Sequence, residues 1–100
     1  MQIKILGEHL SVTEAIKQYI HDKVSHLSIP EKISSIEFRI GKQKDEQYVK
    51  FHAIHPSHEP IILNSSDINL YSAIDKLMDK VHRNFVKSKE CHHTHLHKAI

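Results

Sequence analysis

Two segments of the chain alternate strictly between apolar and polar residues, and this alternation constrains the fold more than any other feature. Residues 36–40 read Ile-Glu-Phe-Arg-Ile, and residues 49–53 read Val-Lys-Phe-His-Ala. Successive side chains of a β-strand point to opposite faces of its sheet, so each segment predicts a strand with one buried face. The polar stretch 41–45 between them predicts a turn, which would pair the two strands in antiparallel fashion.

Two other segments carry apolar residues at helical spacing. In residues 12–27 apolar side chains recur every three or four positions, as is typical of an amphipathic helix. Residues 11–14, Ser-Val-Thr-Glu, have the form of a capping box, whose serine would cap this helix. The second helix is predicted to run from about residue 68 to about residue 90, and either Ser66 or Asp67 can cap its N-terminus.

The order of these segments predicts a single α+β domain of the form β-α-β-β-β-α. One strand, residues 2–6, precedes the first helix, and another, from residue 60, follows the two alternating strands. Short turns join the last three strands, so they should form an antiparallel meander, whereas the first strand should pair in parallel with the second. Both helices need a surface for their apolar sides, and one face of a four-stranded mixed sheet supplies it.

The predicted domain spans residues 1–90, and the His-rich residues 91–100 are expected to form a flexible tail. Of the 100 residues, 39% are hydrophobic and 26% are charged, which suits one small globular domain. No apolar run approaches the roughly 18 residues of a membrane helix, and no secretory signal is visible at the N-terminus. The single cysteine fits a reducing compartment, so we expect a cytoplasmic protein without membrane association.

The sequence contains no motif that would nominate an enzyme. It has no Gly-rich phosphate loop, no nucleophile elbow and no paired-histidine metalloprotease motif. No set of titratable residues is spaced in a way that selects a catalytic constellation. We therefore expect a protein with neither catalytic activity nor a cofactor.

A row of cations lies on one side of the last predicted helix. Four of its residues are spaced i, i+4, i+7 and i+11: Lys76, Lys80, Arg83 and Lys87. Helical geometry places them in a sector roughly 60° wide, nearly opposite the apolar stripe. Such a row suits a run of phosphates, because each cation would release condensed counterions from a nucleic acid. The alternative is an ordinary solvated face, which the neighbouring Asp75 and Asp79 favour.

Lys23 occupies an unusual position on the first predicted helix. Helical counting places it on the apolar side, where a lysine must extend toward an edge to keep its charge in water. If the two helices pack side by side, the groove between them is such an edge, and Lys23 would extend the cation row there. The alternative is that its aliphatic stem only covers apolar surface.

The C-terminal residues include a cluster of side chains that can bind metals: Cys91, His93, His95 and His97. The principal alternative function is therefore a small metal-binding protein that uses this cluster. Structural zinc sites usually draw their ligands from two separated pairs that close a fold. A single terminal cluster would not hold the predicted core together, so we expect no physiological metal site.

The last predicted helix also resembles that of a known family. Residues 67–77, Asp-Ile-Asn-Leu-Tyr-Ser-Ala-Ile-Asp-Lys-Leu, resemble the last helix of the ribosome hibernation-promoting factor / ribosome-associated inhibitor A family. The start of the chain, residues 1–7 and 12–16, is similar to the start of that family. The resemblance covers residues 1–90 in the same element order. The family's second, C-terminal domain has no counterpart here, so we expect a short form.

This resemblance implies a non-enzymatic protein that binds the small ribosomal subunit in the channel for messenger and transfer RNA. Such proteins inhibit translation during stress or stationary phase, and the short forms act together with a separate ribosome modulation factor. The implied fold is similar to a double-stranded-RNA-binding domain, and we expect a monomer away from the ribosome. The resemblance assigns ribosomal RNA contacts to the following cations: Lys23, Lys76, Lys80, Arg83, Lys87 and Lys89.

Overall fold

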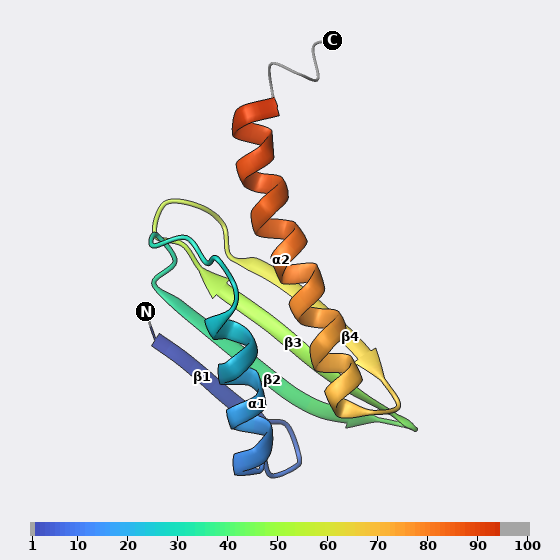
Figure 1. Cartoon of the computed structure of the whole chain (residues 1–100). Helices are drawn as coiled ribbons and strands as arrows, with labels where there is room; N and C mark the ends of the chain where they lie inside the picture. The colour runs from blue at the N-terminus through green and yellow to red at the C-terminus, as the bar shows by residue number, and fades with distance from the viewer. Residues whose placement is uncertain (1, 95–100) are drawn as a thin grey trace.

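The computed structural model describes residues 2–94, and it describes side chains for residues 2–86. The elements follow in the order β1 (Gln2–Gly7), α1 (Glu14–Ser25), β2 (Ser35–Gln43), β3 (Glu46–Ile54), β4 (Ile61–Asp67) and α2 (Leu70–Thr94). This order confirms the predicted β-α-β-β-β-α arrangement and the α+β class. Both helices lie on one face of a single sheet (Figure 1).

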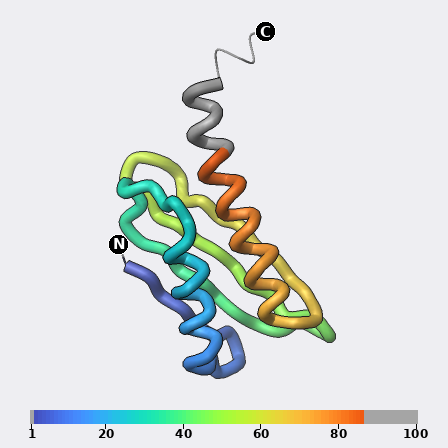
Figure 2. The backbone as a smooth tube through the Cα atoms, viewed as in Figure 1, coloured from blue at the N-terminus to red at the C-terminus, as the bar shows by residue number. Residues whose placement is uncertain are grey.

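The four strands lie in the order β1-β2-β3-β4, so the chain adds each new strand beside the previous one. β1 pairs in parallel with β2, while β2, β3 and β4 pair in antiparallel fashion, as the sequence predicts. Figure 2 shows how the chain passes from β1 through α1 before it returns to the sheet at β2. β1 and β4 are consequently the two edges of the sheet.

The core lies between the sheet and the two helices, and it contains the apolar residues of both alternating strands. Phe38 of β2 and Phe51 of β3 are fully buried at its centre, and their ring centroids are 5.4 Å apart. Ile20 of α1 and Ile74 of α2 are also fully buried. The period-two pattern in β2 and β3 and the helical pattern in α1 and α2 therefore converge on one apolar layer.

The first helix begins two residues later than a cap at Ser11 would place it. Thr13 is the N-cap, and its hydroxyl oxygen accepts a hydrogen bond from the backbone N–H of Ile16 at 3.2 Å. The predicted cap at Ser11 is therefore wrong. Threonine satisfies the free N–H groups of a first helical turn as serine does, so the sequence Ser-Val-Thr-Glu offers two competing caps.

The predicted caps of α2 are also wrong, because β4 continues through Ser66 to Asp67. Asn69 caps the helix instead, and its side-chain oxygen accepts hydrogen bonds from the backbone N–H groups of Tyr71 and Ser72. Asp67 supports this turn by accepting a hydrogen bond from the N–H of Asn69 at 3.1 Å. At its other end α2 continues to Thr94, four residues beyond the predicted end near Glu90.

The turn between β2 and β3 is shorter than the predicted stretch 41–45. The strands continue to Gln43 and resume at Glu46, and Lys44 adopts a left-handed backbone conformation with φ of 57°. Gly41 faces Tyr48 across this hairpin, and a Cβ atom at Gly41 would collide with the Tyr48 ring. Gly41 therefore makes room for the Tyr48 ring within this paired stretch.

Tyr48 belongs to a polar cluster on the face of the sheet that the helices leave open. Its hydroxyl donates a hydrogen bond to Glu8 Oε1 at 2.7 Å, and the ammonium of Lys50 lies 3.7 Å from the same oxygen. Arg39 also approaches Glu8, at 3.7 Å, and donates to Glu37 at 2.8 Å. The hydrogen bond from Tyr48, with help from the two cations, lowers the pKa of Glu8 below its ordinary value of 4.5.

The buried aromatic pair gives a direct test of this fold. We expect Phe38→Ala or Phe51→Ala to lower the free energy of unfolding by about 3–5 kcal/mol, because each leaves a large cavity in the core. Urea denaturation of the two variants measures the change. Ile62, which is 67% exposed on the polar face, supplies the matched control, and its replacement by alanine should cost much less. An unchanged urea midpoint in both phenylalanine variants would show that the wrong face had been identified as the core.

The Glu8 cluster predicts how stability depends on pH. Because the folded pKa of Glu8 lies below 4.5, its contribution is complete above that pH and is lost as the pH falls through the folded value. We expect Glu8→Gln to lose less stability than the wild type between about pH 5 and pH 3. Urea midpoints across this range measure the difference. Glu14→Gln, which removes a carboxylate that is 92% exposed, is the control for the loss of one charge. Equal pH profiles for Glu8→Gln and Glu14→Gln would contradict the role of Glu8.

Candidate nucleic-acid interface

The first cations of the predicted row extend from α2 toward the edge strand β4. The ammonium of Lys80 donates a hydrogen bond to the backbone oxygen of Asn64 at 2.8 Å. One helical turn earlier, the ammonium of Lys76 lies 2.7 Å from Asp67 Oδ2 and 3.4 Å from the backbone oxygen of Ser66. The two lysines therefore lean over β4, and they do not project straight away from the sheet.

Arg83 lies one turn farther along the same side of α2. Its guanidinium is 2.9 Å from Asp79 Oδ2, and the two side chains are 68% and 65% exposed. An exposed ion pair of this kind contributes little to stability, because water screens it and both side chains lose freedom. The pair can therefore exchange its carboxylate for another anion at small cost.

These side chains surround a hollow of about 400 Å³ between α2 and β4, which we call the α2–β4 groove. Its lining comprises three cations, one carboxylate and a short stretch of β4: Lys76, Lys80, Arg83, Asp79 and residues 64–66. The groove is therefore polar and carries a local excess of positive charge. Both properties suit a phosphate better than an apolar ligand.

Asp67 limits the charge at one end of this groove. The hydrogen bond from Lys76 and the backbone N–H of Asn69 lower the pKa of Asp67 below its ordinary value of 3.8. Asp67 is thus ionised at neutral pH, and it neutralises Lys76 in the free protein. A phosphate that bound Lys76 would compete with this carboxylate.

Lys23 lies at the junction of the helices, as the sequence predicts, but it does not extend the cation row. Its ammonium is 3.6 Å from Asp75 Oδ1 and 5.3 Å from the centre of the Tyr19 ring. Tyr19 donates a hydrogen bond of 2.6 Å to the same carboxylate, which raises the pKa of Tyr19. Asp75 therefore ties α2 to α1, and α2 itself separates Lys23 from the lysines that lean over β4.

Six of the predicted site residues have side chains outside the part of the chain that the structure describes. Lys87, Lys89, Cys91 and His93 belong to the backbone of α2, but their side chains lie outside the described residues, as do His95 and His97 altogether. Within the residues whose side chains are described, no group of three His, Cys, Asp or Glu side chains could hold a metal ion. The predicted terminal cluster lies outside that part of the chain.

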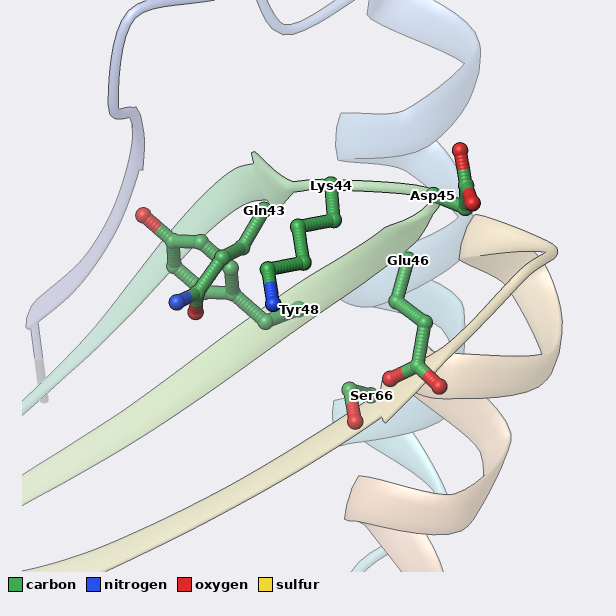
Figure 3. A pocket seen from close by; sticks show the side chains of 6 residues that line it. All are labelled: Gln43, Lys44, Asp45, Glu46, Tyr48 and Ser66. Atoms are coloured by element: carbon green, nitrogen blue, oxygen red, sulfur yellow. The ribbon is translucent and has the colours of Figure 1, made fainter.

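A second hollow, of about 390 Å³, lies at the tip of the β2–β3 hairpin. Figure 3 shows Lys44 extending toward Tyr48 and Gln43, the Glu46 carboxylate beside Ser66, and Asp45 pointing away. One cation and two carboxylates line this hollow. It therefore lacks the excess of positive charge that distinguishes the α2–β4 groove.

The sequence interpretation missed the contribution of β4 to this surface. Asn64 and Ser66 contact the lysines through backbone atoms, so neither side chain signals the contact. Asp67 could be suspected only as a helix cap, whereas it is the partner of Lys76. The pairing of Asp79 with Arg83 was readable, because the two residues are four positions apart on one helix.

Residues 3–93 match the family model described as Sigma 54 modulation protein / S30EA ribosomal protein. The chain belongs to this family. A ribosome hibernation promoting factor from Azotobacter vinelandii is 33% identical over 91 residues, which cover 90% of this chain and 84% of the relative. One from Pseudomonas putida is 32% identical and covers 90% of this chain and 88% of the relative. The predicted membership in the hibernation-promoting family is thus confirmed.

Two solved structures share the fold of this family member. A ribosomal subunit interface protein from Coxiella burnetii superimposes with a TM-score of 0.82 at 21% identity, over 89% of this chain and 98% of the other. The N-terminal domain of Protein Y from Thermus thermophilus gives a TM-score of 0.71 at 22% identity, over 84% and 94% of the two chains. At these identities the likeness establishes the fold alone. Among residues 2–94, neither helix of this chain is long and apolar enough to cross a membrane.

The Arg83–Asp79 pair yields a prediction about charge. Asp79→Asn should make the chain elute from a heparin column at higher salt, because Arg83 loses its anionic partner. The free energy of unfolding should change by less than about 0.5 kcal/mol, since the pair is exposed. Asp22→Asn is the control, because it removes the same charge from an exposed position on α1. Equal elution of both variants would show that Asp79 does not shield the α2–β4 groove.

Proposed function

We propose that this protein is a ribosome hibernation factor that binds the small ribosomal subunit in the channel for messenger and transfer RNA and inhibits translation during stress or stationary phase. The observation that carries this proposal is the match of residues 3–93 to a family whose relatives are named ribosome hibernation promoting factors. The cation-lined groove supplies a physical means of holding RNA. The protein acts by occupying a site in the cytoplasm, and no covalent bond is made or broken.

Lys76, Lys80 and Arg83 are the residues proposed to hold ribosomal RNA phosphates in the α2–β4 groove. Lys87 and Lys89 follow on the same helix and are the further residues proposed to contact ribosomal RNA. Lys23, on the other side of α2, would meet a separate segment of RNA. Contacts to phosphates set the position of the protein, while the shape of the ribosomal channel supplies selectivity.

RNA binding exchanges the anionic partners of the groove cations. In the free protein Arg83 is paired with the exposed Asp79, and Lys76 with Asp67, whose side chain is 26% exposed. The exposed Arg83–Asp79 pair is worth at most about 1 kcal/mol. RNA offers a row of phosphates with condensed counterions, and their release favours binding at low and moderate salt. The cations therefore gain more from RNA than they lose by leaving their carboxylates.

This exchange predicts a steep salt dependence of ribosome binding. Lys80→Ala and Arg83→Ala should each weaken binding to small ribosomal subunits and flatten the log–log salt slope by a little under ~1 per lost phosphate contact. Arg83→Ala should have the larger effect, since guanidinium can grip a phosphate with two parallel hydrogen bonds. Co-sedimentation in sucrose gradients at two salt concentrations measures both quantities.

Lys50→Ala is the matched control for this experiment. Lys50 lies on the opposite sheet face, where it approaches Glu8 and lies 5.1 Å from the centre of the Tyr48 ring. Its removal deletes one positive charge without touching the groove, so the salt slope should stay near the wild-type value. Melting temperatures should remain nearly constant in all three variants. Wild-type affinity in both helix variants would mean that the cations form only a solvated face.

A further inference from the structure

The open side of β4 presents backbone groups to the α2–β4 groove. β4 is an edge strand, so only one of its sides is paired, by β3 (Figure 1). The N–H and C=O of one residue in a strand point to the same side, and successive residues alternate. Alternate residues of β4 therefore direct their backbone groups away from β3.

Two observations show which residues face the open side. First, Lys80 and Lys76 reach the backbone oxygens of Asn64 and Ser66, so those oxygens are accessible from outside the sheet. Second, Gln2 and Glu8 of the β1 region donate to the oxygens of Ser34 and Ile40. The backbone groups of even-numbered β2 residues thus face β1, and those of odd-numbered β2 residues face β3. Odd-numbered β2 residues pair with even-numbered β3 residues, so the odd-numbered β3 residues face β4. These pair with odd-numbered β4 residues, whose backbone groups therefore lie on the paired side of β4.

It follows that the N–H groups of Ile62, Asn64 and Ser66 point to the open side. Those of Asn64 and Ser66 border the groove beside Lys76, Lys80 and Arg83, whereas Ile62 is not part of its lining. Along β4 the two N–H groups are about 7 Å apart. Along α2 the two lysines are about 6 Å apart. Donors on the strand and cations on the helix therefore run alongside each other.

We propose that the backbone of a single RNA strand runs along the edge of β4, where phosphate oxygens accept hydrogen bonds from the N–H groups of Asn64 and Ser66 while Lys76, Lys80 and Arg83 neutralise the charge. The combination resembles other anion sites in proteins, in which backbone N–H groups and a nearby cation share one phosphate. In the free protein Asp67 pairs with Lys76 and Asp79 pairs with Arg83. On binding, phosphate replaces these two carboxylates. The recognition is independent of sequence, because no base is read.

This inference rests on the proposed function and adds the strand edge to the binding surface. It differs from binding by the helix alone in one respect, since substitutions that remove an N–H from β4 should weaken binding. Proline removes that N–H, and an edge strand tolerates it because the lost donor belongs to no ladder bond. Asn64→Pro and Ser66→Pro are therefore the test variants. Ile62→Pro makes the same change outside the groove, and Asn64→Ala and Ser66→Ala remove the side chains but keep the N–H groups.

Binding to purified small ribosomal subunits is measured for these variants beside Lys80→Ala, with melting temperatures to verify the fold. We expect Asn64→Pro and Ser66→Pro to weaken binding roughly tenfold each, the scale of a hydrogen bond to a charged group. Ile62→Pro should bind within about twofold of the wild type, and each alanine variant should bind more tightly than the proline variant at the same position. In the ¹⁵N-labelled wild-type chain, a mixed-sequence single-stranded RNA should shift the amide signals of Asn64 and Ser66 but not that of Ile62.

The outcomes separate this inference from the proposed function. If Lys80→Ala weakens ribosome binding while the proline variants bind normally, RNA contacts the helix but not the strand edge, and only this inference is overturned. If Lys80→Ala and the proline variants all bind like the wild type, the α2–β4 groove does not hold RNA, and this inference fails together with the assignment of its cations. If the wild-type chain itself does not bind small subunits, the proposed function fails as well. Should the proline variants not fold, the wild-type amide shifts decide, and unmoved signals at Asn64 and Ser66 in the RNA-bound chain would overturn the inference.

Discussion

The structure depends on the burial of two helices against one face of a four-stranded sheet. Phe38 and Phe51, on neighbouring strands, meet at the centre of that face, and the fully buried Ile20 and Ile74 approach them from the two helices. Because the whole core lies on this side, the other face of the sheet remains polar and contributes charge clusters instead of packing. The position of α2 over β3 and β4 follows from its apolar stripe, and that position creates the α2–β4 groove.

The chain carries its cations in a partly neutralised form. Lys76, Arg83 and Lys23 each have a carboxylate partner within 4 Å: Asp67, Asp79 and Asp75. The partners nevertheless differ in role. Asp75 also accepts a hydrogen bond from Tyr19 and so joins the two helices, whereas Asp79 contacts only its own helix in the interactions described here. Aspartates of α2 thus serve both the packing of the two helices, through Asp75, and the control of surface charge, through Asp79.

The fold was largely predictable from the sequence because its strongest signals are periodic. Alternation in β2 and β3 identified the buried face, and helical spacing identified the buried sides of α1 and α2. The helix starts were not predictable to the residue, because Ser11 and Thr13, or Asp67 and Asn69, are chemically equivalent caps and only tertiary contacts choose between them. The site was predictable only in part. Spacing identified the α2 cations, but the contribution of β4 comes from backbone atoms, which every sequence possesses.

The lining of the groove is compact along the chain, and this has a consequence for how it forms. Its residues all fall between positions 64 and 83, and only residues 68 and 69 separate β4 from α2. The strand and helix can therefore meet after closing a very short loop, at small entropic cost. β1, in contrast, pairs with β2 only across α1 and its flanking loops, a far longer closure. The groove thus belongs to the most local part of the topology. We expect the contacts of the C-terminal half to form first, and the pairing of β1 with β2 to form later because its loop closure costs more entropy.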